Sequence, residues 1–496
     1  MTGGSLVAWR VMSPRAAGLL LAACSPSAGP LAPPPAGAWV VMLASSGTVE
    51  NDALGLTAAG ELVAVSTANI AGDRGTLVVR AGEARREQTV ATSARTGGRP
   101  PASVLRLGPG GELRGLDALE LGGRVLASAV LVDGVAAIGR YDAAVGMATI
   151  AASAPADGGA FVASLDADGR PRWARAIGGG VAMAVTGTPD GGLAIAGFFG
   201  EALTIAGAPD AGLAAAPGGS PLFVASFTAD GQLRWLRGAE SGQVVPALLG
   251  AGADGGVRVV GGCDGQAVLR GATAQRTIEC GTPGQVFAAA YTAEGELAWF
   301  TGLPGKVDAL NLRGVALADG GVALAGAFGE TIGGGGFPVV TATPGKDAFV
   351  ARIGPGGEPR WLRHVRGPGV EFVRAVAADV DGSVWALTIA DDDAEVVDGE
   401  ALRPASGALL LQYDVEGALA RMNRLADVVR PVGEARTGLS PDRVAVGGGA
   451  VHIAGTVFGE VRMTVGASQL ALSAPTAPAS GSGFVVGFPV AAVPPP

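Results

Sequence analysis

The sequence is poor in the residues on which common metal-binding and catalytic sites depend. Its 496 residues include only 2 His and 3 Cys, and these form no zinc-type cluster along the chain. Lysine occurs only at Lys306 and Lys346, and the formal net charge is −9. Nucleic-acid-binding surfaces concentrate Lys and Arg on one face, so we expect no nucleic-acid partner. We also expect no metal and no other cofactor.

Long apolar segments are missing as well. No uninterrupted apolar run approaches the roughly 18 to 20 residues that a membrane-spanning helix needs. Disorder is also excluded, because 48% of the residues are hydrophobic and only 16% are charged. The sequence is instead rich in glycine (83) and proline (32), which together make up close to a quarter of it. A folded chain with this composition needs many turns.

The first 23 residues have the pattern of a secretory signal peptide. Arg10 and Arg15 supply positive charge, residues 16–23 form a short apolar segment, and Leu21 to Cys24 read Leu-Ala-Ala-Cys. This tetrapeptide resembles the lipobox of bacterial lipoproteins, a family in which the cysteine is acylated and becomes the new N-terminus. The resemblance implies lipidation of Cys24 and contact with the membrane through this lipid anchor alone. An ordinary signal peptide with a chance cysteine is the alternative.

Export of the chain would explain the composition of residues 24–37 and would allow a disulfide in the folded domain. Residues 24–37 are rich in Pro, Ser and Ala, a composition typical of a tether between an anchor and a folded domain. With Cys24 lipidated, Cys263 and Cys280 remain as a pair in an oxidising compartment. We predict a disulfide between them; two free thiols are the alternative.

An internal repeat covers most of the chain. Four segments, beginning at Gly158, Ser220, Gly284 and Lys346, align without gaps. Short apolar runs bounded by Asp-Gly and Gly-Gly turns indicate β-hairpins, so each repeat is predicted to contain four antiparallel strands, named A to D. The aligned aromatic residues of strands C and D recur at steps of 62, 64 and 62 residues: Phe161, Phe223, Phe287 and Phe349, and Trp173, Trp235, Trp299 and Trp361.

Weaker copies extend the repeat toward both ends. A period of about 60 residues with four strands is typical of a propeller blade. We therefore expect an all-β fold, a seven-bladed β-propeller of four-stranded antiparallel blades over residues 38–490, with a disordered tail at 491–496. The A–B hairpins are predicted to open near Ala53, Arg124, Val181, Val245, Leu312, Val373 and Asp442.

The two ends of the repeat complement each other. Trp39 has the spacing of a strand D residue with no strand C before it, whereas Phe484 lies in a strand C with no strand D after it. We therefore predict that residues 38–43 complete the C-terminal blade. This pairing would close the ring and leave no open sheet edge.

The blade pattern resembles that of the bacterial seven-bladed-propeller repeat family, most closely over residues 347–361. The resemblance implies the fold and an extracytoplasmic setting, and it implies no reaction. The first and sixth blades depart from the pattern. Ser103 and Leu409 stand at the Phe position of these blades, and Gly115 and Arg421 stand at the Trp position.

The expected roles of residues follow from their strands and connections. The repeated Phe and Trp residues, with Trp39 and Phe484, are predicted to pack between blades. The A–B and C–D turns are short and share one face, whereas the B–C connections are long, and long loops on a rigid scaffold often bind partners. We therefore predict partner binding on the B–C face, by loops that include Arg85, Arg86, Asp391, Asp392 and Asp393.

Other motifs are weaker. Residues 166–169 and 379–382 resemble the start of a calcium loop but lack its later Glu, so we interpret both as hairpin turns. His364 and His452 are predicted in strands D and B, away from the inner strand A. A general base in the central channel would then be a carboxylate.

The sequence predicts an exported protein that is lipid-anchored to the bacterial envelope, at the outer membrane. It is expected to be a monomer that binds an unidentified protein or polysaccharide without catalysing a reaction. The alternative is a propeller lyase or hydrolase that uses carboxylates at the channel mouth, and a third option is a spacer without a ligand. Two or more Asp, Glu, His or Arg side chains meeting at the channel mouth would favour the enzyme, whereas a channel lined by Ala, Gly and Val would favour binding.

Overall fold

The computed structural model describes residues 37–495 apart from fourteen short segments. These are 46–47, 69–73, 92–101, 120, 122–123, 142–158, 209, 215–220, 240–242, 308–311, 400, 428–429, 433–434 and 475–480. The predicted signal peptide, Cys24 and the predicted tether up to residue 36 lie outside the described residues. Within the described residues, no helix is long and apolar enough to span a bilayer.

The fold is all-β, and its strands follow the predicted order A to D in every repeat. Strand β11 (Pro171–Gly187) serves two neighbouring sets, because its first part pairs with β10 and its second part with β12. In the order A, B, C, D the sets are β2 (Val49–Leu56), β3 (Leu62–Ala68), β6 (Ala102–Leu107), β7 (Leu113–Ala118); β8 (Arg124–Val130), β9 (Gly134–Tyr141), β10 (Gly159–Asp166), β11; β11, β12 (Leu193–Ile205), β14 (Leu222–Phe227), β15 (Leu233–Gly238); β16 (Gln243–Ala251), β17 (Val257–Arg270), β18 (Gln275–Tyr291), β19 (Leu297–Val307); β20 (Arg313–Ala316), β21 (Val322–Gly334), β23 (Asp347–Ile353), β24 (Pro359–Arg366); β25 (Phe372–Ala378), β26 (Val384–Asp398), β27 (Ala401–Tyr413), β28 (Leu419–Ala426); and β30 (Ala435–Gly447), β31 (Ala450–Phe458), β34 (Ser482–Pro489), β1 (Trp39–Ala44).

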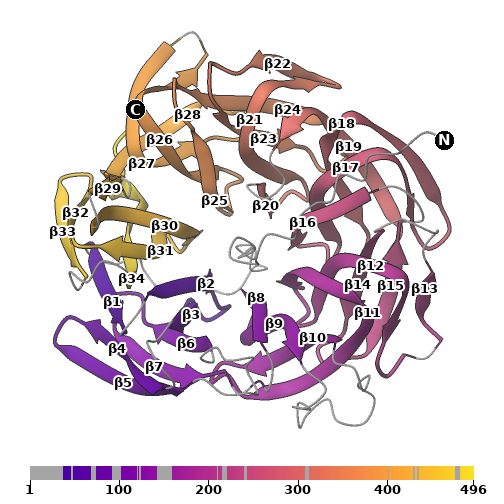
Figure 1. Ribbon diagram of the computed structural model, residues 1–496, viewed down its shortest axis with the longest axis horizontal. Coiled ribbons are helices and arrows are strands. Elements are labelled where there is room, and N and C mark those ends of the chain that lie inside the picture. The colour runs from indigo at the N-terminus through magenta and orange to yellow at the C-terminus, as the bar shows by residue number, and fades with distance from the viewer. Residues whose placement is uncertain are drawn as a thin grey trace, which may run out of the picture.

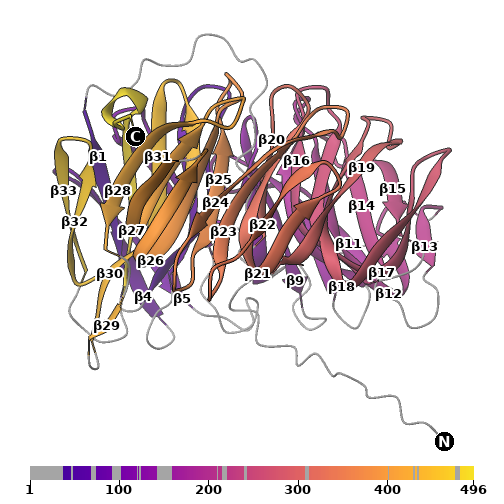
Figure 2. The ribbon, with the colours of Figure 1, turned by 90° about the horizontal axis from the view of Figure 1, so that it is seen from above.

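The sets are arranged around a common centre in a propeller-like manner (Figure 1). The A strands β2, β16, β20, β25 and β30 lie nearest this centre, and the later strands of each set lie farther out. Seen from above, the strands cross the thickness of the body (Figure 2). The core lies between neighbouring sets, where the Phe residues of the C strands are 0–1% exposed: Phe161, Phe223, Phe287, Phe349 and Phe484.

The short turns are built by Asp and Gly. In the turn that joins β10 to β11, the Oδ1 atom of Asp166 accepts hydrogen bonds from the N–H groups of Asp168 and Arg170, both at 2.9 Å. Gly169 has a φ of +79°, a conformation that side chains with a Cβ rarely adopt. Residues 166–169 therefore form a hairpin turn, as the sequence predicted.

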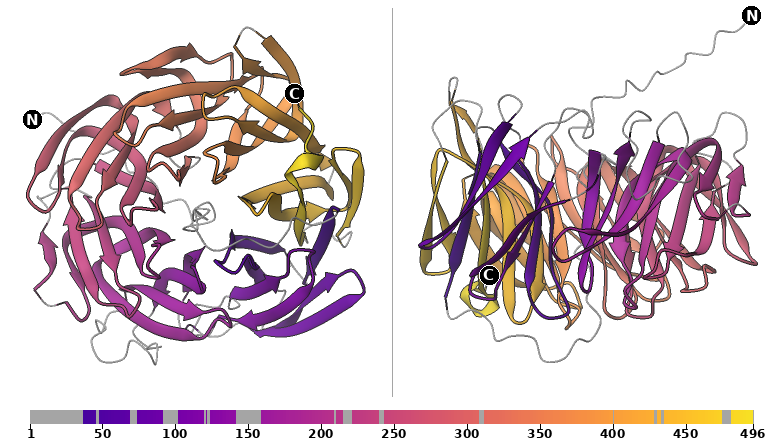
Figure 3. Two further views of the ribbon diagram at one scale, coloured as in Figure 1. Left: turned by 180° about the vertical axis from the view of Figure 1, so that it is seen from behind. Right: turned by 90° about the horizontal axis from the view of Figure 1, so that it is seen from below.

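Strand β1 joins the two ends of the described chain. It pairs antiparallel with β34, with Trp39 opposite Gly487 and Met42 opposite Phe484. On its other edge β1 pairs with β4 (Arg74–Ala81). Figure 3 shows the indigo N-terminal strands next to the yellow C-terminal strands. The predicted pairing of residues 38–43 with the strand around Phe484 is thus present.

Additional strands arise in the B–C connections, and together we call them the outer strands. They are β4, β5 (Ala84–Ala91), β13 (Gly212–Ala214), β22 (Phe337–Thr341), β32 (Glu460–Val465) and β33 (Ser468–Ser473), with the outer parts of β12, β17, β18, β21, β26 and β27. Several pair with strand D of the preceding set, as in Gly305 opposite Ile332 and Val365 opposite Val396. The B–C connections are long, as predicted, but much of their described length is strand and not loop. Beside β30 lies the short strand β29 (Arg430–Val432).

The predicted disordered tail at 491–496 is wrong for the residues that the structure describes. Val490–Ala492 form a 3-10 helix (η4), and Val493 is fully buried. Arg421 Nη1 donates a hydrogen bond to the carbonyl of Val493 at 2.6 Å. The last set takes its strand D from the N-terminal side of the chain, so it has no C–D turn, and residues 490–495 occupy the space where such a turn would contact the preceding set.

Candidate functional site

The repeated Trp residues join each set to the next. The indole Nε1 of a strand D Trp donates a hydrogen bond to a carbonyl in the C–D turn of the following set. The pairs are Trp173 to Ala229, 2.8 Å; Trp235 to Ala293, 2.8 Å; Trp361 to Val415, 3.0 Å; and Trp39 to Pro109, 3.0 Å. Trp299, 6% exposed, is packed by Gly357 of the next turn. These contacts agree with the predicted packing role of the Trp residues.

Where the preceding set has the Trp, the glycine of the C–D turn lies against its indole ring. A Cβ added to Gly417 would come within 2.7 Å of the Trp361 ring, and one added to Gly231 within 2.6 Å of the Trp173 ring. Both glycines also have a φ of +83°. Glycine is therefore required at these turn positions for two reasons: the backbone conformation and the indole of the neighbouring set.

In the sets that lack the strand D Trp, an arginine makes the contact with the next set. Gly115 leaves room for Arg106, whose Nη2 reaches Asp168 in the next C–D turn at 2.7 Å. Arg421 makes the equivalent contact to residues 490–495. The first and sixth sets thus keep a contact between neighbours despite their departures from the sequence pattern.

The innermost strands bring charged side chains together on one side of the centre. Arg374 of β25, Asp442 of β30 and Asp52 of β2 each occupy the place where the strand register shifts, as in a β-bulge. A bulge changes the direction of a side chain relative to the regular strand. Arg313 and Arg443, on β20 and β30, belong to the same group. Figure 1 shows these four strands as neighbours near the centre.

The contacts within this central charged cluster are specific. Arg374 Nη2 lies 3.8 Å from Asp442 Oδ1 and donates a hydrogen bond to Ser440 Oγ at 3.2 Å. Arg313 Nε donates to the carbonyl of Arg374 at 2.7 Å. Burial raises the pKa of Asp442, and the nearby arginines, Arg374 first, oppose this effect. A carboxyl with a raised pKa beside arginines is an arrangement that acid–base catalysts and anion sites both use.

The same arginines also have a structural use. Arg443 Nε donates to the carbonyl of Asp52 in the adjacent set at 3.3 Å, and its Nη1 donates to the carbonyl of Asp442 at 2.8 Å. Arg313 Nη1 donates to the carbonyl of Leu312 at 2.8 Å. The bond to Asp52 ties neighbouring A strands together, and the bonds to the carbonyls of the preceding residues fix the guanidinium groups.

The predicted acidic loop is an irregularity within β26. Residues 391–393 interrupt the pairing of β26 with β27 between Ala390 and Ala394. Asp393 has a φ of +65°, the single positive φ at a non-glycine residue in the part of the chain that the structure describes. Asp391 Oδ2 accepts a hydrogen bond from the N–H of Val370 at 3.2 Å. Asp391 therefore holds the segment that enters β25.

Glu371, in that segment, was not singled out by the sequence. It is fully buried, and within the described residues neither of its carboxylate oxygens has a hydrogen-bond partner. Burial, followed by the charge of the fully buried Asp347, raises the pKa of Glu371 to about 7. Three acidic side chains, Asp347, Glu371 and Asp391, are thus close enough to repel one another when ionised.

We expect Glu371→Gln to stabilise the protein at pH 8 and to flatten its stability profile. An unfolded Glu ionises near pH 4.5, whereas folded Glu371 keeps its proton up to about pH 7. Stability from this group is complete below pH 4.5 and is lost as the pH rises toward 7, by about 3 kcal/mol. Urea unfolding at pH 5 and pH 8 measures the difference. Glu416→Gln, in an exposed turn, is the control, and equal pH profiles for wild type and Glu371→Gln would contradict this account.

The predicted binding residues Arg85 and Arg86 lie in the outer strand β5 and not in a loop. Both are exposed, and Arg85 forms an ion pair with Glu87 on the same strand. Arg86 lies opposite Val79 in the pairing of β4 with β5. The structure does not bring these residues near Asp391 or Asp393, which belong to a different set.

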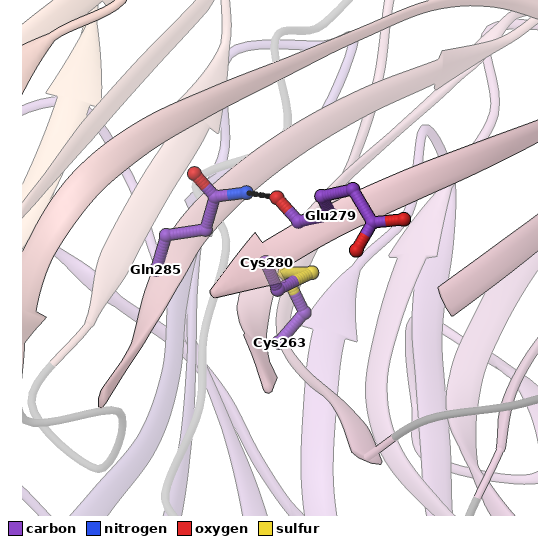
Figure 4. Close-up of a disulfide and its surroundings, with 4 residues drawn as sticks. All are labelled: Cys263, Glu279, Cys280 and Gln285. Carbon is purple, nitrogen blue, oxygen red and sulfur yellow. Dashed lines mark hydrogen bonds between the residues drawn. A yellow bond between two sulfur atoms is a disulfide. The ribbon is translucent and has the colours of Figure 1, made fainter. Parts of the chain in front are cut away.

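The predicted disulfide between Cys263 and Cys280 is present and buried. It links β17 to β18 where these strands extend beyond their set. Gln285 Nε2 donates to the carbonyl of Glu279 at 3.1 Å beside the bridge (Figure 4). The cross-link therefore fixes an outer strand pair at its base.

The two histidines occupy the predicted strands, β24 and β31. His452 is buried against Trp39, with ring centroids 5.8 Å apart, and burial lowers its pKa to about 4. Burial also lowers the pKa of His364. In the part of the chain that the structure describes, no three His, Cys, Asp or Glu side chains are grouped in a way that could hold a metal ion.

Comparison with known proteins gives distant likenesses. No family model and no curated protein matches the sequence. Puromycin hydrolase aligns with 14% identity over 83% of this chain and 59% of its own, with a TM-score of 0.36. The GH74 xyloglucanase from Xanthomonas campestris aligns with 11% identity over 90% of this chain and 100% of its own, with a TM-score of 0.21. The chain thus spans less than two thirds of puromycin hydrolase, and neither likeness informs on activity.

Proposed function

We propose that the sets form a closed, seven-bladed β-propeller in which β1 is strand D of the last blade. The support is that contacts across the junction repeat those between other sets. Trp39 donates to the carbonyl of Pro109 just as Trp235 donates to that of Ala293. Closure removes the sheet edge that β34 would otherwise expose.

The proposed setting is the bacterial envelope, with Cys24 acylated and the chain exported. The Leu-Ala-Ala-Cys sequence supports lipidation, and the disulfide is consistent with an oxidising compartment. In this setting residues 24–37 connect the membrane to β1. The propeller would stand at the outer membrane and touch it through the acyl chains alone.

The proposed function is that of a binding module for an envelope component. One observation carries it: the strand sets and their Trp contacts recur, whereas the outer strands differ from set to set. One set adds the β4–β5 hairpin, another the disulfide-linked extension of β17 and β18, and a third the bulge at residues 391–393. Variation on a constant scaffold is typical of binding surfaces.

An envelope hydrolase or lyase is the second candidate, favoured by the meeting of Arg374 and Asp442 near the centre. The backbone hydrogen bonds of Arg313 and Arg443 account for much of this cluster as structure, which is why binding ranks first. Asp442→Asn separates the two. It removes the activity of an enzyme of this kind, and it leaves partner capture by the outer strands unchanged.

The test of the proposed function is capture from envelope extracts by the full chain, purified in detergent and crosslinked. We expect a saccharide or protein component to be captured by wild type and by Cys24→Ala. The Cys24→Ala variant should incorporate no labelled fatty acid and should leave the membrane fraction. Capture of no component by wild type would overturn the binding function, and labelling of Cys24→Ala would overturn the anchor.

A further inference from the structure

A groove of about 530 Å³ lies on the outer wall of the molecule between the fourth and fifth sets. Its floor is strand β19, and its sides are the return strand of the disulfide-linked extension, the turn after β21 and the turn between β23 and β24. Its volume falls within the usual range of sites for small ligands. The lining residues used below are Arg276, Glu279, Gln285, Phe300, Thr301 and Pro304.

The groove exists because one repeat departs from the others at two adjacent positions. After the strand D Trp, three repeats place Ala or Leu and then Arg: Ala174 and Arg175, Leu236 and Arg237, and Leu362 and Arg363. The fourth repeat places Phe300 and Thr301. A departure that opens space and adds an aromatic ring, within an otherwise regular repeat, points to use by a ligand.

The arginines show what Thr301 leaves empty. Each donates its Nε–H to the glycine carbonyl of the next C–D turn, at 3.1 Å for Arg175, 2.9 Å for Arg237 and 2.7 Å for Arg363. Thr301 Oγ1 donates to the equivalent carbonyl of Gly357. The short side chain keeps this hydrogen bond but does not fill the surface that a guanidinium covers. The hydrogen bond to the glycine carbonyl of the next C–D turn is therefore kept, and the groove opens beside it.

The walls of the groove are held in place. The disulfide of Cys280 fixes the strand that carries Glu279, and the amide of Gln285 donates to the Glu279 carbonyl (Figure 4). Phe300 stacks on the buried Phe287, with ring centroids 5.5 Å apart and an interplanar angle of 19°. A preformed site of this kind loses little entropy when a ligand binds.

We propose that this groove binds a neutral saccharide chain, an inference that rests on the proposed binding function. A sugar ring presents C–H groups on its faces and hydroxyls at its edges. The half-buried Phe300 and the exposed Pro304 suit the C–H groups, whereas Gln285, Arg276 and Glu279 supply donors and acceptors for hydroxyls. Arg276 and Glu279 carry opposite charges, so the charge of the groove wall is balanced, which suits a neutral ligand better than an acidic or basic one.

The repeat itself supplies the decisive variant. Thr301→Arg restores the residue of three other repeats, so its guanidinium has the Gly357 carbonyl as a ready acceptor and fills the groove without disturbing the fold. Phe300→Leu restores the other repeat residue and removes the ring. Arg237→Thr, in the preceding set, is the matched control for the exchange of Arg and Thr.

The experiment is isothermal titration of the full chain, in detergent, with β-linked hexamers of glucose, xylose, mannose and N-acetylglucosamine. We expect at least one hexamer to bind wild type and Arg237→Thr equally. We expect Thr301→Arg and Phe300→Leu each to weaken that binding at least tenfold, with the melting temperature of Thr301→Arg unchanged or raised. A peptide with the sequence of residues 25–36 tests a proline-rich ligand in parallel.

The proposal is overturned if no hexamer binds, if Thr301→Arg binds as well as wild type, or if the peptide alone binds. The envelope capture experiment distinguishes failure of the groove proposal from failure of the proposed binding function. Undiminished capture by Thr301→Arg would refute the groove and leave the binding function standing. Capture of no component by wild type would refute the binding function itself.

Discussion

Deletion of residues 38–43 is expected to lower the free energy of unfolding by roughly 8 kcal/mol. The deletion removes Leu43 and Val41, both almost completely buried, and the Trp39 contact to Pro109. Full burial of an aliphatic side chain contributes about 1.5–3 kcal/mol, and loss of a packed Trp costs about 3–5 kcal/mol. It also leaves β34 and β4 with unpaired edges. Scanning calorimetry should show a melting temperature lower by roughly 8 °C, at about 1 °C per kcal/mol for a domain of this size.

Deletion of residues 26–31 is the matched control, because it removes six residues from the predicted tether. Its melting temperature should equal that of the wild type. If deletion of residues 38–43 left the unfolding transition unchanged, β1 would contribute nothing to closure and the proposed ring would be wrong.

Trp361→Ala is expected to cost about 3–5 kcal/mol of stability, since it removes a buried indole and its hydrogen bond to Val415. Gly417→Ala is expected to cost about 2 kcal/mol or more, because its φ of +83° strains any residue with a Cβ. The added Cβ would also lie 2.7 Å from the Trp361 ring. Urea unfolding of both single variants measures these two costs.

The double variant separates the two costs of Gly417→Ala. In the double variant the ring is absent, so Gly417→Ala costs only its backbone strain. The sum of the costs of the two single variants should therefore exceed the cost of the double variant by at least 1 kcal/mol. Gly399→Ala is the control, because it also has a positive φ, +61°, but no atom lies within 4 Å of its added Cβ. Simple additivity would show that the indole and the turn do not act on each other.

Much of the fold could be predicted because its determinants are local and repeated. The steps between Phe and Trp residues and the Asp-Gly turns indicate the strand order A to D, and the spacing of Trp39 indicates the pairing of β1 with β34. The outer strands could not be predicted in the same way. Strand β4 pairs with β1, which belongs to the last set, so the hydrogen bonds that order residues 74–81 come from a distant part of the chain.

The charged groups were visible in the sequence, but their meeting was not. Arg374 is the single charged residue of β25, and Asp442 lies next to Arg443 in β30, but their sequence positions do not reveal that both stand at register shifts of neighbouring strands. Glu371 gave no signal at all, because nothing local distinguishes a buried Glu before a strand from an exposed one. The groove beside Phe300 depends on Thr301 standing where other repeats have Arg, a signal that becomes readable once the partner of that Arg is known.

The position of β1 between β34 and β4 sets an order of events in folding. Strand β1 precedes all other described strands in synthesis, whereas β34 follows all other described strands. Contacts between such distant segments form slowly, because a long loop must close first. Under our proposal the chain is exported. Its last blade would therefore stay incomplete until the residues of β34 have crossed the membrane. Folding would then finish on the far side of the membrane.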